Sequence, residues 1–234
     1  MARAAKTAPT AKADPRARIV DALMELAGER PWEDISITDI AARAGVSLAD
    51  FRDAFPSKGA VLAGLSRRID RIVLDDTGDE LAGEPAKDRL FDVLMRRLDA
   101  MAPYRAGLEA VAGWARRDPV AALALNQMAV NSMRFMLEAA RIDAEGPLGL
   151  AKTQGLVLVW LRVLDVWFDD DEGDLSRTMA VLDRELARGG EWARRAEKLH
   201  ELAQPLRNLC AALFAPRPAA RAPRRRSEDE TVDV

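Results

Sequence analysis

The residue types that most often carry enzyme chemistry are scarce in this chain of 234 residues. It has one histidine, His200, and one cysteine, Cys210, so neither a Cys/His zinc site nor an intrachain disulfide can form. A nucleophile activated by histidine would have to use His200, which lies on a charged stretch, and no glycine-rich phosphate-binding loop is present. We therefore expect no catalysis, no metal and no cofactor, and we interpret His200 as a surface residue.

The composition is typical of a helical protein that stays in solution. Apolar residues make up 49% of the chain and charged residues 31%, and runs of β-branched residues are scarce. The apolar run 155–168 contains Arg162 and Asp165 and is too short to span a bilayer, so it predicts a buried or dimer-interface helix and no transmembrane segment. The single cysteine and an N-terminus without an apolar core point to a cytoplasmic protein. The net charge of −3 argues against a wholly basic surface but is compatible with a local basic patch.

Start signals for short helices follow one another near the N-terminus. Asp14 and Pro15 are typical of the start of a first helix. Ser36 and Ser47 are each followed three residues later by an aspartate, which is a capping-box pattern, and Gly45 between them permits the left-handed backbone of a tight turn. Apolar residues are spaced to meet in one small core, namely Ile40, Ala41, Val46, Phe51 and Phe55. This pattern predicts a helix-turn-helix.

Four segments are predicted along an all-α chain. They are a disordered basic arm (1–13), a three-helix helix-turn-helix domain (14–62), a larger helical domain (63–214), and a disordered tail (215–234). The helix that starts at Lys58 has an apolar stripe at Val61, Leu62, Leu65, Ile69 and Ile72. Later helices are expected to begin near Pro85, Pro103, Asp118, Gly146 and Asp174. Gly189 and Gly190 are expected to separate off a final helix that ends near Phe214.

A set of motifs between residues 16 and 62 has a characteristic order and spacing. After an amphipathic helix come Trp32, Ser36-Ile37-Thr38-Asp39-Ile40-Ala41, Ala44-Gly45-Val46-Ser47, Phe55 and Ser57-Lys58. This pattern resembles the TetR family of bacterial transcription regulators. The resemblance implies a homodimeric, ligand-responsive DNA-binding regulator, most often a repressor, whose partners are a double-stranded DNA operator and a small molecule. Residues 63–214 would then be the ligand-binding and dimerisation domain. Ligand bound there would favour a dimer whose two recognition helices no longer match successive major grooves.

The same resemblance implies which side chains contact DNA. The matching positions are Ser36, Thr38, Ser47, Leu48, Ala49, Arg52, Asp53 and Lys58. Arg52 stands where the family usually has a tyrosine, and it could replace a tyrosine–phosphate contact with a charged one. Asp50 and Asp53 repel phosphate; Asp50 is explained as a capping acid, whereas Asp53 could accept a hydrogen bond from cytosine N4. The arm residues Arg3, Lys6 and Lys12 either reach the minor groove or form a solvated tail.

A second resemblance lies in the other half of the chain. An aromatic-rich helix, an acidic turn and a Thr-x-x-x-Leu-Asp-Arg stretch are formed by Trp160, Trp167, Phe168, Asp169-Asp170-Asp171, Thr178 and Leu182-Asp183-Arg184. Together with residues 95–111, they resemble the lipid-binding accessory protein of coenzyme Q biosynthesis, a family that shares the fold. This resemblance implies the alternative function, a lipid- or isoprenoid-binding protein that keeps the TetR fold without DNA binding.

Soft and aromatic apolar residues are concentrated on the predicted middle helices. They are Met95, Met101, Trp114, Met128, Met133, Met136 and Trp160. One interpretation is an ordinary core. The other is a cavity for an apolar small molecule or lipid, because methionine repacks easily around different ligands.

Overall fold

The computed structural model describes residues 14–76, 78, 82–191 and 195, and within these ranges the regular structure is entirely helical. The chain divides into two units, Met1–Ala193 and Arg194–Val234, and everything below concerns the first. The predictions for the arm 1–13, His200, Cys210, the final helix up to Phe214 and the tail 215–234 lie outside the described residues. None of the described helices combines the length and apolar character that crossing a membrane requires.

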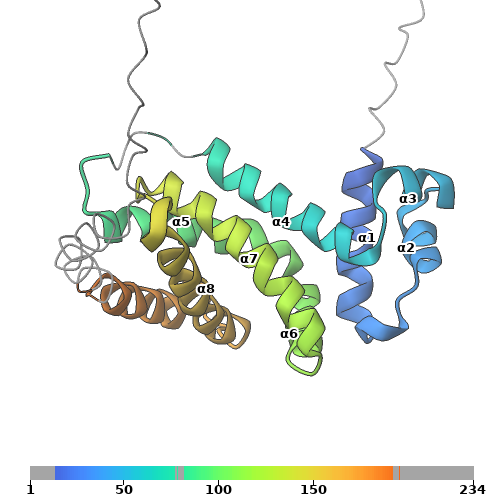
Figure 1. Cartoon of the computed structure of the whole chain (residues 1–234). Coiled ribbons are helices and arrows are strands. Elements are labelled where there is room, and N and C mark those ends of the chain that lie inside the picture. Colours follow the sequence, from blue (N-terminus) through green and yellow to red (C-terminus); the bar gives the residue numbers. More distant parts are fainter. Residues whose placement is uncertain (1–13, 77, 79–81, 192–194, 196–234) are drawn as a thin grey trace, which may run out of the picture. The chain divides into compact units, whose positions relative to one another are not determined.

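The N-terminal helices pack together at one end of this unit and are called the small domain below. They are α1 (Pro15–Glu29), the 3-10 turn η1 (Trp32–Asp34), α2 (Ile37–Ala44) and α3 (Leu48–Ala54). The Asp14 carboxylate accepts a hydrogen bond from the Arg16 backbone N–H at 3.1 Å, which caps α1 as the sequence predicts. α1 packs against α2, α3, α4 and α6, so this helix joins the small domain to the rest of the unit (Figure 1).

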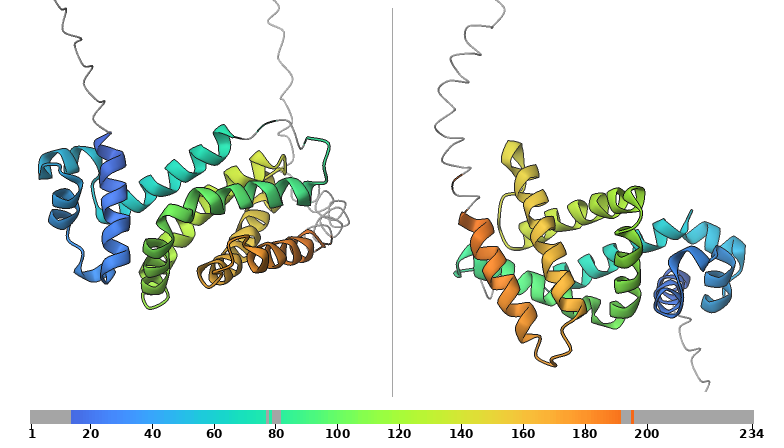
Figure 2. Two further views of the ribbon diagram at one scale, coloured as in Figure 1. Left: turned by 180° about the vertical axis from the view of Figure 1, so that it is seen from behind. Right: turned by 90° about the horizontal axis from the view of Figure 1, so that it is seen from below.

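The remaining helices build the larger domain. They are α4 (Lys58–Asp75), α5 (Ala86–Met101), the 3-10 turn η2 (Ala102–Tyr104), α6 (Arg105–Ala115), α7 (Pro119–Ala139), α8 (Gly146–Phe168) and a helical segment at 176–191. α7 packs against α4, α5, α6 and α8, and the 176–191 segment, orange in Figure 2, runs beside α8. The predicted helix starts near Pro85, Asp118 and Gly146 are confirmed.

Several boundary predictions need correction. Ile72 is 49% exposed, and Val73 takes its place in the core, because one further residue restores the helical spacing after Ile69. The last described helix begins at residue 176 rather than at Asp174, and it continues through Gly189 and Gly190 to residue 191. A glycine inside a helix costs only about 1 kcal/mol, so neighbouring packing can keep it helical.

Candidate nucleic-acid interface and ligand cavity

Two capping boxes fix where α2 and α3 begin. The Ser36 hydroxyl accepts from the Asp39 backbone N–H at 3.1 Å, and Asp39 accepts from the Ser36 backbone N–H at 2.9 Å. Ser47 and Asp50 repeat this exchange at 3.0 and 3.2 Å. Hydrogen bonds from the serine side chain and backbone hold the pKa of each aspartate below its ordinary value. The sequence prediction of two capped helices is therefore confirmed, and it accounts for the acid at Asp50.

The turn between these helices is held by a left-handed glycine and an arginine from α1. Gly45 has φ 62°, a conformation that side chains with a Cβ rarely adopt. Arg18 donates from Nη1 to the carbonyls of Ala44 at 2.8 Å and Gly45 at 3.1 Å. These two bonds tie the turn between α2 and α3 to α1.

The outer face of α3 presents the predicted DNA-contacting residues. Phe51 is buried against α1 and α2, and the side chains one and two positions away from it point outward. Leu48 is 54% exposed, and Arg52 and Asp53 are also exposed. Of the other predicted DNA contacts, only Lys58 is partly buried. The exposed ones are Ser36, Thr38, Ser47 and Ala49.

Lys58 has an internal role that the sequence did not indicate. Its ammonium donates to the Trp32 carbonyl at 2.6 Å and to the Ile35 carbonyl at 2.8 Å, and it lies 4.4 Å from the centre of the Trp32 ring. Burial lowers the pKa of Lys58, an effect that Glu33 opposes. These contacts fasten the start of α4 to η1. They use two of the three N–H donors of the ammonium, so the phosphate contact of Lys58 stays a prediction.

The small domain carries a net negative charge, which disfavours non-specific binding to DNA. Residues 14–65 contain nine Asp or Glu and six Arg or Lys. Several of these cations form ion pairs within the small domain: Arg43 pairs with Glu29 at 2.7 Å, and Arg30 pairs with Asp39 at 3.1 Å. Arg52 is the one cation on α3, and within the described part of the chain no hydrogen bond or ion pair engages it. Arg52 is therefore the one side chain on α3 that can offer a positive charge to a phosphate.

A cavity of about 390 Å³ lies in the larger domain. Its wall is formed by α4, α6, α7 and α8, with one residue from α5, and is mostly apolar, with contributions from Leu65, Val111, Met128, Trp160 and Phe168. The volume is within the range of small-molecule sites. Near its rim, Arg116 and Asp165 form an ion pair in which both side chains are exposed.

One charged side chain lining the cavity is buried. Arg97 on α5 is 5% exposed, and its Nη1 donates to Asp70 on α4. Asp70 also accepts from the Ser132 hydroxyl at 2.6 Å. The Arg97 guanidinium lies 5.7 Å from the centre of the Trp160 ring. Its Nε is buried without a hydrogen-bond partner, which is uncommon for a buried donor.

Only two of the seven residues predicted to bind ligand reach this cavity. Met128 and Trp160 line it. Met101, Met133 and Met136 are buried in the core, and Met95 packs against that core. Trp114 stacks on Trp32 instead, with ring centres 5.0 Å apart. The core interpretation thus describes most of this set, because a methionine on an apolar helix face is equally suited to core and cavity.

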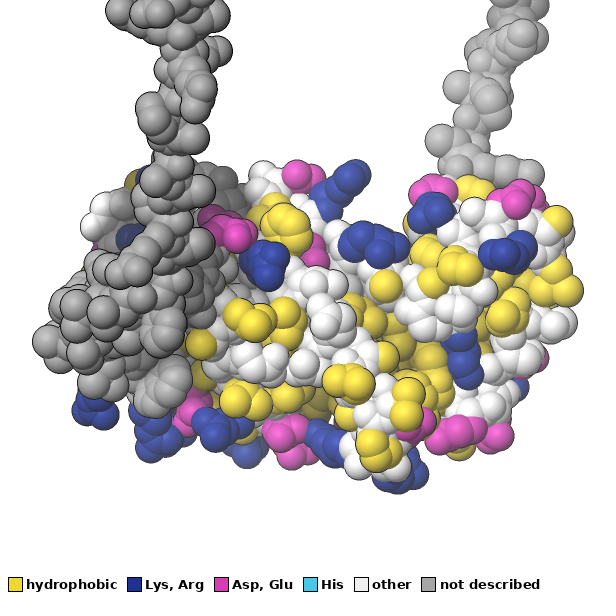
Figure 3. Space-filling model, viewed as in Figure 1, with side chains coloured by type: hydrophobic (Ala, Val, Ile, Leu, Met, Phe, Trp, Pro, Cys, Tyr) yellow, Lys and Arg dark blue, Asp and Glu magenta, His cyan; other side chains and the backbone are white. Residues whose placement is uncertain are grey.

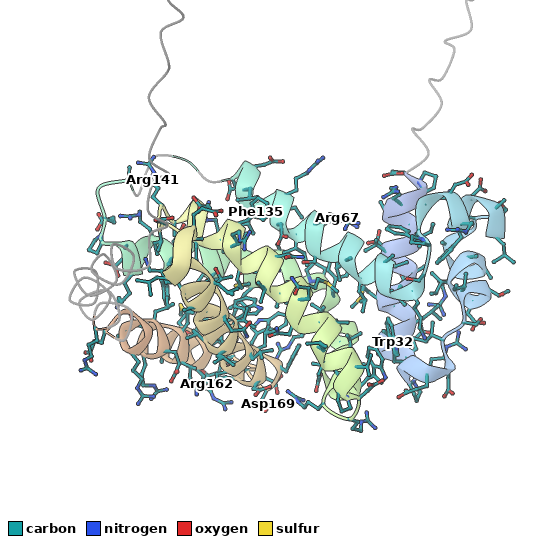
Figure 4. The ribbon with its side chains drawn as sticks, in the orientation of Figure 1. Trp32, Arg67, Phe135, Arg141, Arg162 and Asp169 are labelled. Atoms are coloured by element: carbon teal, nitrogen blue, oxygen red, sulfur yellow. The ribbon has the colours of Figure 1, made fainter. Side chains whose placement is uncertain are left out.

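The seam between α1 and α6 connects the small domain to the cavity wall. Gly107 lies so close to α1 that a Cβ there would sit 2.5 Å from the Met24 carbonyl oxygen. The Trp32–Trp114 stack closes the same seam, and Figure 4 shows Trp32 beside the end of α6. Asp21 on α1 accepts from Arg68 at 2.7 Å and from Tyr104 at 3.0 Å. These contacts join the small domain to α4, η2 and α6.

The apolar stripe of α5 indicates that Arg97 is buried, although the sequence analysis above did not single it out. On α5 the buried positions include Leu90, Leu94, Leu98 and Met101, and the spacing of this stripe also buries position 97. An arginine on the buried face of an amphipathic helix needs a partner, which is a reason to look for a polar site.

Comparisons with known proteins agree with this architecture. Residues 19–65 match the sequence profile of the family described as bacterial regulatory proteins, tetR family. The TetR transcriptional regulator from Nitrosomonas europaea ATCC 19718 is similar in structure with a TM-score of 0.59 and 25% identity, over 76% of this chain and 99% of that one.

Two further solved structures resemble the chain. A TetR transcriptional regulator from Rhodococcus sp. RHA1 has a TM-score of 0.52 and 21% identity, covering 75% of this chain and 95% of that one. A tetR-family regulator from Streptomyces coelicolor has a TM-score of 0.50 and 16% identity, covering 86% and 92%. At these identities the likeness concerns the fold alone. No curated protein sequence matches the chain.

Proposed function

We propose that this chain, which has the fold and the N-terminal helix-turn-helix of the TetR-family transcription regulators, binds operator DNA through α3 as a homodimer and responds to a small ligand. The observation that carries the proposal is the exposed face of α3, where Arg52 is available for phosphate and Leu48 for base edges. We expect it to act in the cytoplasm, and as a repressor, because a dimer seated on an operator blocks access to that DNA.

The homodimer is proposed to form through α8. Two α3 helices must be held at a fixed spacing to enter successive major grooves. Leu150 is 61% and Leu158 53% exposed on α8, and a Cβ at Gly155 between them would meet no neighbouring atom. Large apolar side chains around a glycine suit close helix–helix packing between two copies.

The response to ligand is proposed to begin at the cavity. α4 and α6 line the cavity and also contact α1, so a ligand that favours one position of these helices also favours one position of the small domain. The contacts of Asp21 with Arg68 and Tyr104 and the Trp32–Trp114 stack are the connections through which the shift would pass.

The test is selection of duplexes from random DNA by the full chain, followed by affinity measurements on the selected site across salt concentrations. Arg52→Ala should weaken binding to every sequence and reduce the salt slope by about one unit, because one phosphate contact is lost. Arg117→Ala is the matched control: it also removes an exposed arginine, but from the end of α6, and it should leave the slope unchanged. Failure to select any sequence would refute DNA recognition.

Asp53 separates the regulator from the alternative, a lipid- or isoprenoid-binding protein that does not read DNA. If Asp53 accepts from a cytosine, Asp53→Asn should lose about 1–3 kcal/mol of discrimination at one base pair. If its charge only repels phosphate, the variant should bind all duplexes more tightly with no gain in specificity. A wild type without sequence preference, together with that second result, would favour the alternative.

A further inference from the structure

The cavity contains a buried ion pair with hydrogen-bonding capacity left over. Arg97 lines the cavity, and its Nη1 donates to Asp70, which also accepts from Ser132. A guanidinium has five N–H donors, and among the described residues Arg97 has a hydrogen-bond partner only for Nη1; Nε is shielded from the cavity, so the donor left for a ligand is Nη2. An apolar cavity next to such a donor accommodates a ligand that brings a hydrogen-bond acceptor.

The charge around the cavity restricts what that acceptor can be. Asp70 already neutralises Arg97, and the Arg116–Asp165 pair near the rim is neutral as well. A ligand carboxylate would place a second anion beside one buried cation, and a ligand cation would meet Arg97. Burying an ion without a partner is costly, whereas an uncharged carbonyl or ether oxygen carries no such cost.

We infer that the cavity binds an uncharged, mainly apolar molecule whose single hydrogen-bond acceptor is held by Arg97. This inference rests on the proposed ligand response and specifies its chemistry. The cavity of about 390 Å³ lies toward the small end of small-molecule sites, so the molecule is compact. Trp160, which lies beside the guanidinium, and Phe168 provide aromatic walls for it.

Three naphthalenes of nearly equal size test the inference directly. 2-Acetylnaphthalene is uncharged and carries an acceptor, 2-ethylnaphthalene has no acceptor, and 2-naphthoate is an anion at neutral pH. Equilibrium dialysis against the full chain without DNA gives the three dissociation constants. We expect the acetyl compound to bind about tenfold or more tighter than each of the others, because hydrogen bonds to charged groups are stronger than average.

Two variants test whether the preference for 2-acetylnaphthalene over 2-ethylnaphthalene depends on Arg97. The double variant Arg97→Met/Asp70→Asn removes both charges, so that neither remains buried alone, and it should bind the acetyl and ethyl compounds equally. Arg116→Met removes the arginine near the rim and should keep the wild-type preference. If the double variant does not fold, as judged by circular dichroism, the wild-type ranking still decides the question.

Four results would overturn the inference: tightest binding of 2-naphthoate, equal binding of the acetyl and ethyl compounds, no binding of any of the three, or an unchanged preference in the double variant. The DNA selection described above is independent of these measurements. If the three naphthalenes bind in the expected order but no duplex is selected, the proposed DNA recognition is refuted and the proposed ligand chemistry is supported. Selected DNA with the wrong ranking would refute only the cavity chemistry.

Discussion

The seam between α1 and α6 permits a matched comparison on a single helix. A Cβ at Gly107 would lie 2.5 Å from the Met24 carbonyl oxygen and 2.7 Å from its Cε, whereas a Cβ at Gly113 would have only the Arg117 guanidinium within 4 Å, at 3.9 Å. The Met24 side chain can turn away, but its backbone oxygen cannot. Gly107→Ala must therefore push α1 and α6 apart, and Gly113→Ala need not.

The magnitude follows from two opposing effects. Replacing a helical glycine with alanine stabilises by up to about 1 kcal/mol at either position, so this effect largely cancels between the variants. Overpacking costs about 1–3 kcal/mol and applies to Gly107→Ala alone. Its free energy of unfolding should thus lie about 1–3 kcal/mol below that of Gly113→Ala, and its Tm roughly 2–12 °C lower.

Urea and thermal unfolding of both variants measure this difference. Displacement of α1 also carries α2 and α3 with it, so Gly107→Ala should weaken operator binding while Gly113→Ala retains it. Equal unfolding midpoints in the two variants would refute the tight seam, and with it the connection proposed between cavity and small domain.

Three further outcomes are expected. Lys58→Met should lower the free energy of unfolding by about 2–3 kcal/mol in urea titrations, because two backbone carbonyls lose a charged donor; a phosphate ligand without internal contacts would instead affect only DNA affinity. Leu158→Glu should give a monomer in light scattering at micromolar concentration, while Leu123→Glu, an equally drastic change on α7, should not. Because Ser47 depresses the pKa of Asp50, the charged carboxylate stabilises the fold above about pH 4, and this contribution disappears as the pH falls through the lowered pKa. Asp50→Asn should therefore unfold at a midpoint that depends less on pH between neutral and acid conditions, as followed by circular dichroism.

Exposed apolar side chains on α7 bear on the light-scattering test of dimerisation. Figure 3 shows hydrophobic side chains gathered over α7 and along the border with the small domain, with charged side chains toward the edges of that face. Exposed apolar side chains on α7 include Val120 and Phe135. A monomer produced by Leu158→Glu would thus still present apolar surface, and light scattering should be run at several concentrations to separate specific dimers from association.

The sequence alone determined the features whose partners lie within one or two helical turns. Ser36 and Ser47 predicted both helix starts, because a capping box is complete within three residues. Gly45 predicted the turn, because a positive φ is a property of the single residue. The buried positions Ile40 and Phe51 followed from periodicity, which reports which face of a helix is covered.

Only the tertiary structure decided what depends on distant neighbours. Lys58 contacts carbonyls 23 and 26 residues away, and Ser132 donates to Asp70 across 62 residues. No local pattern encodes such pairs, so the sequence indicated neither the internal contacts of Lys58 nor the buried ion pair of Arg97. The cavity was likewise decided by how α4, α6, α7 and α8 meet, since the same apolar side chain fills a core or lines a void according to what lies opposite.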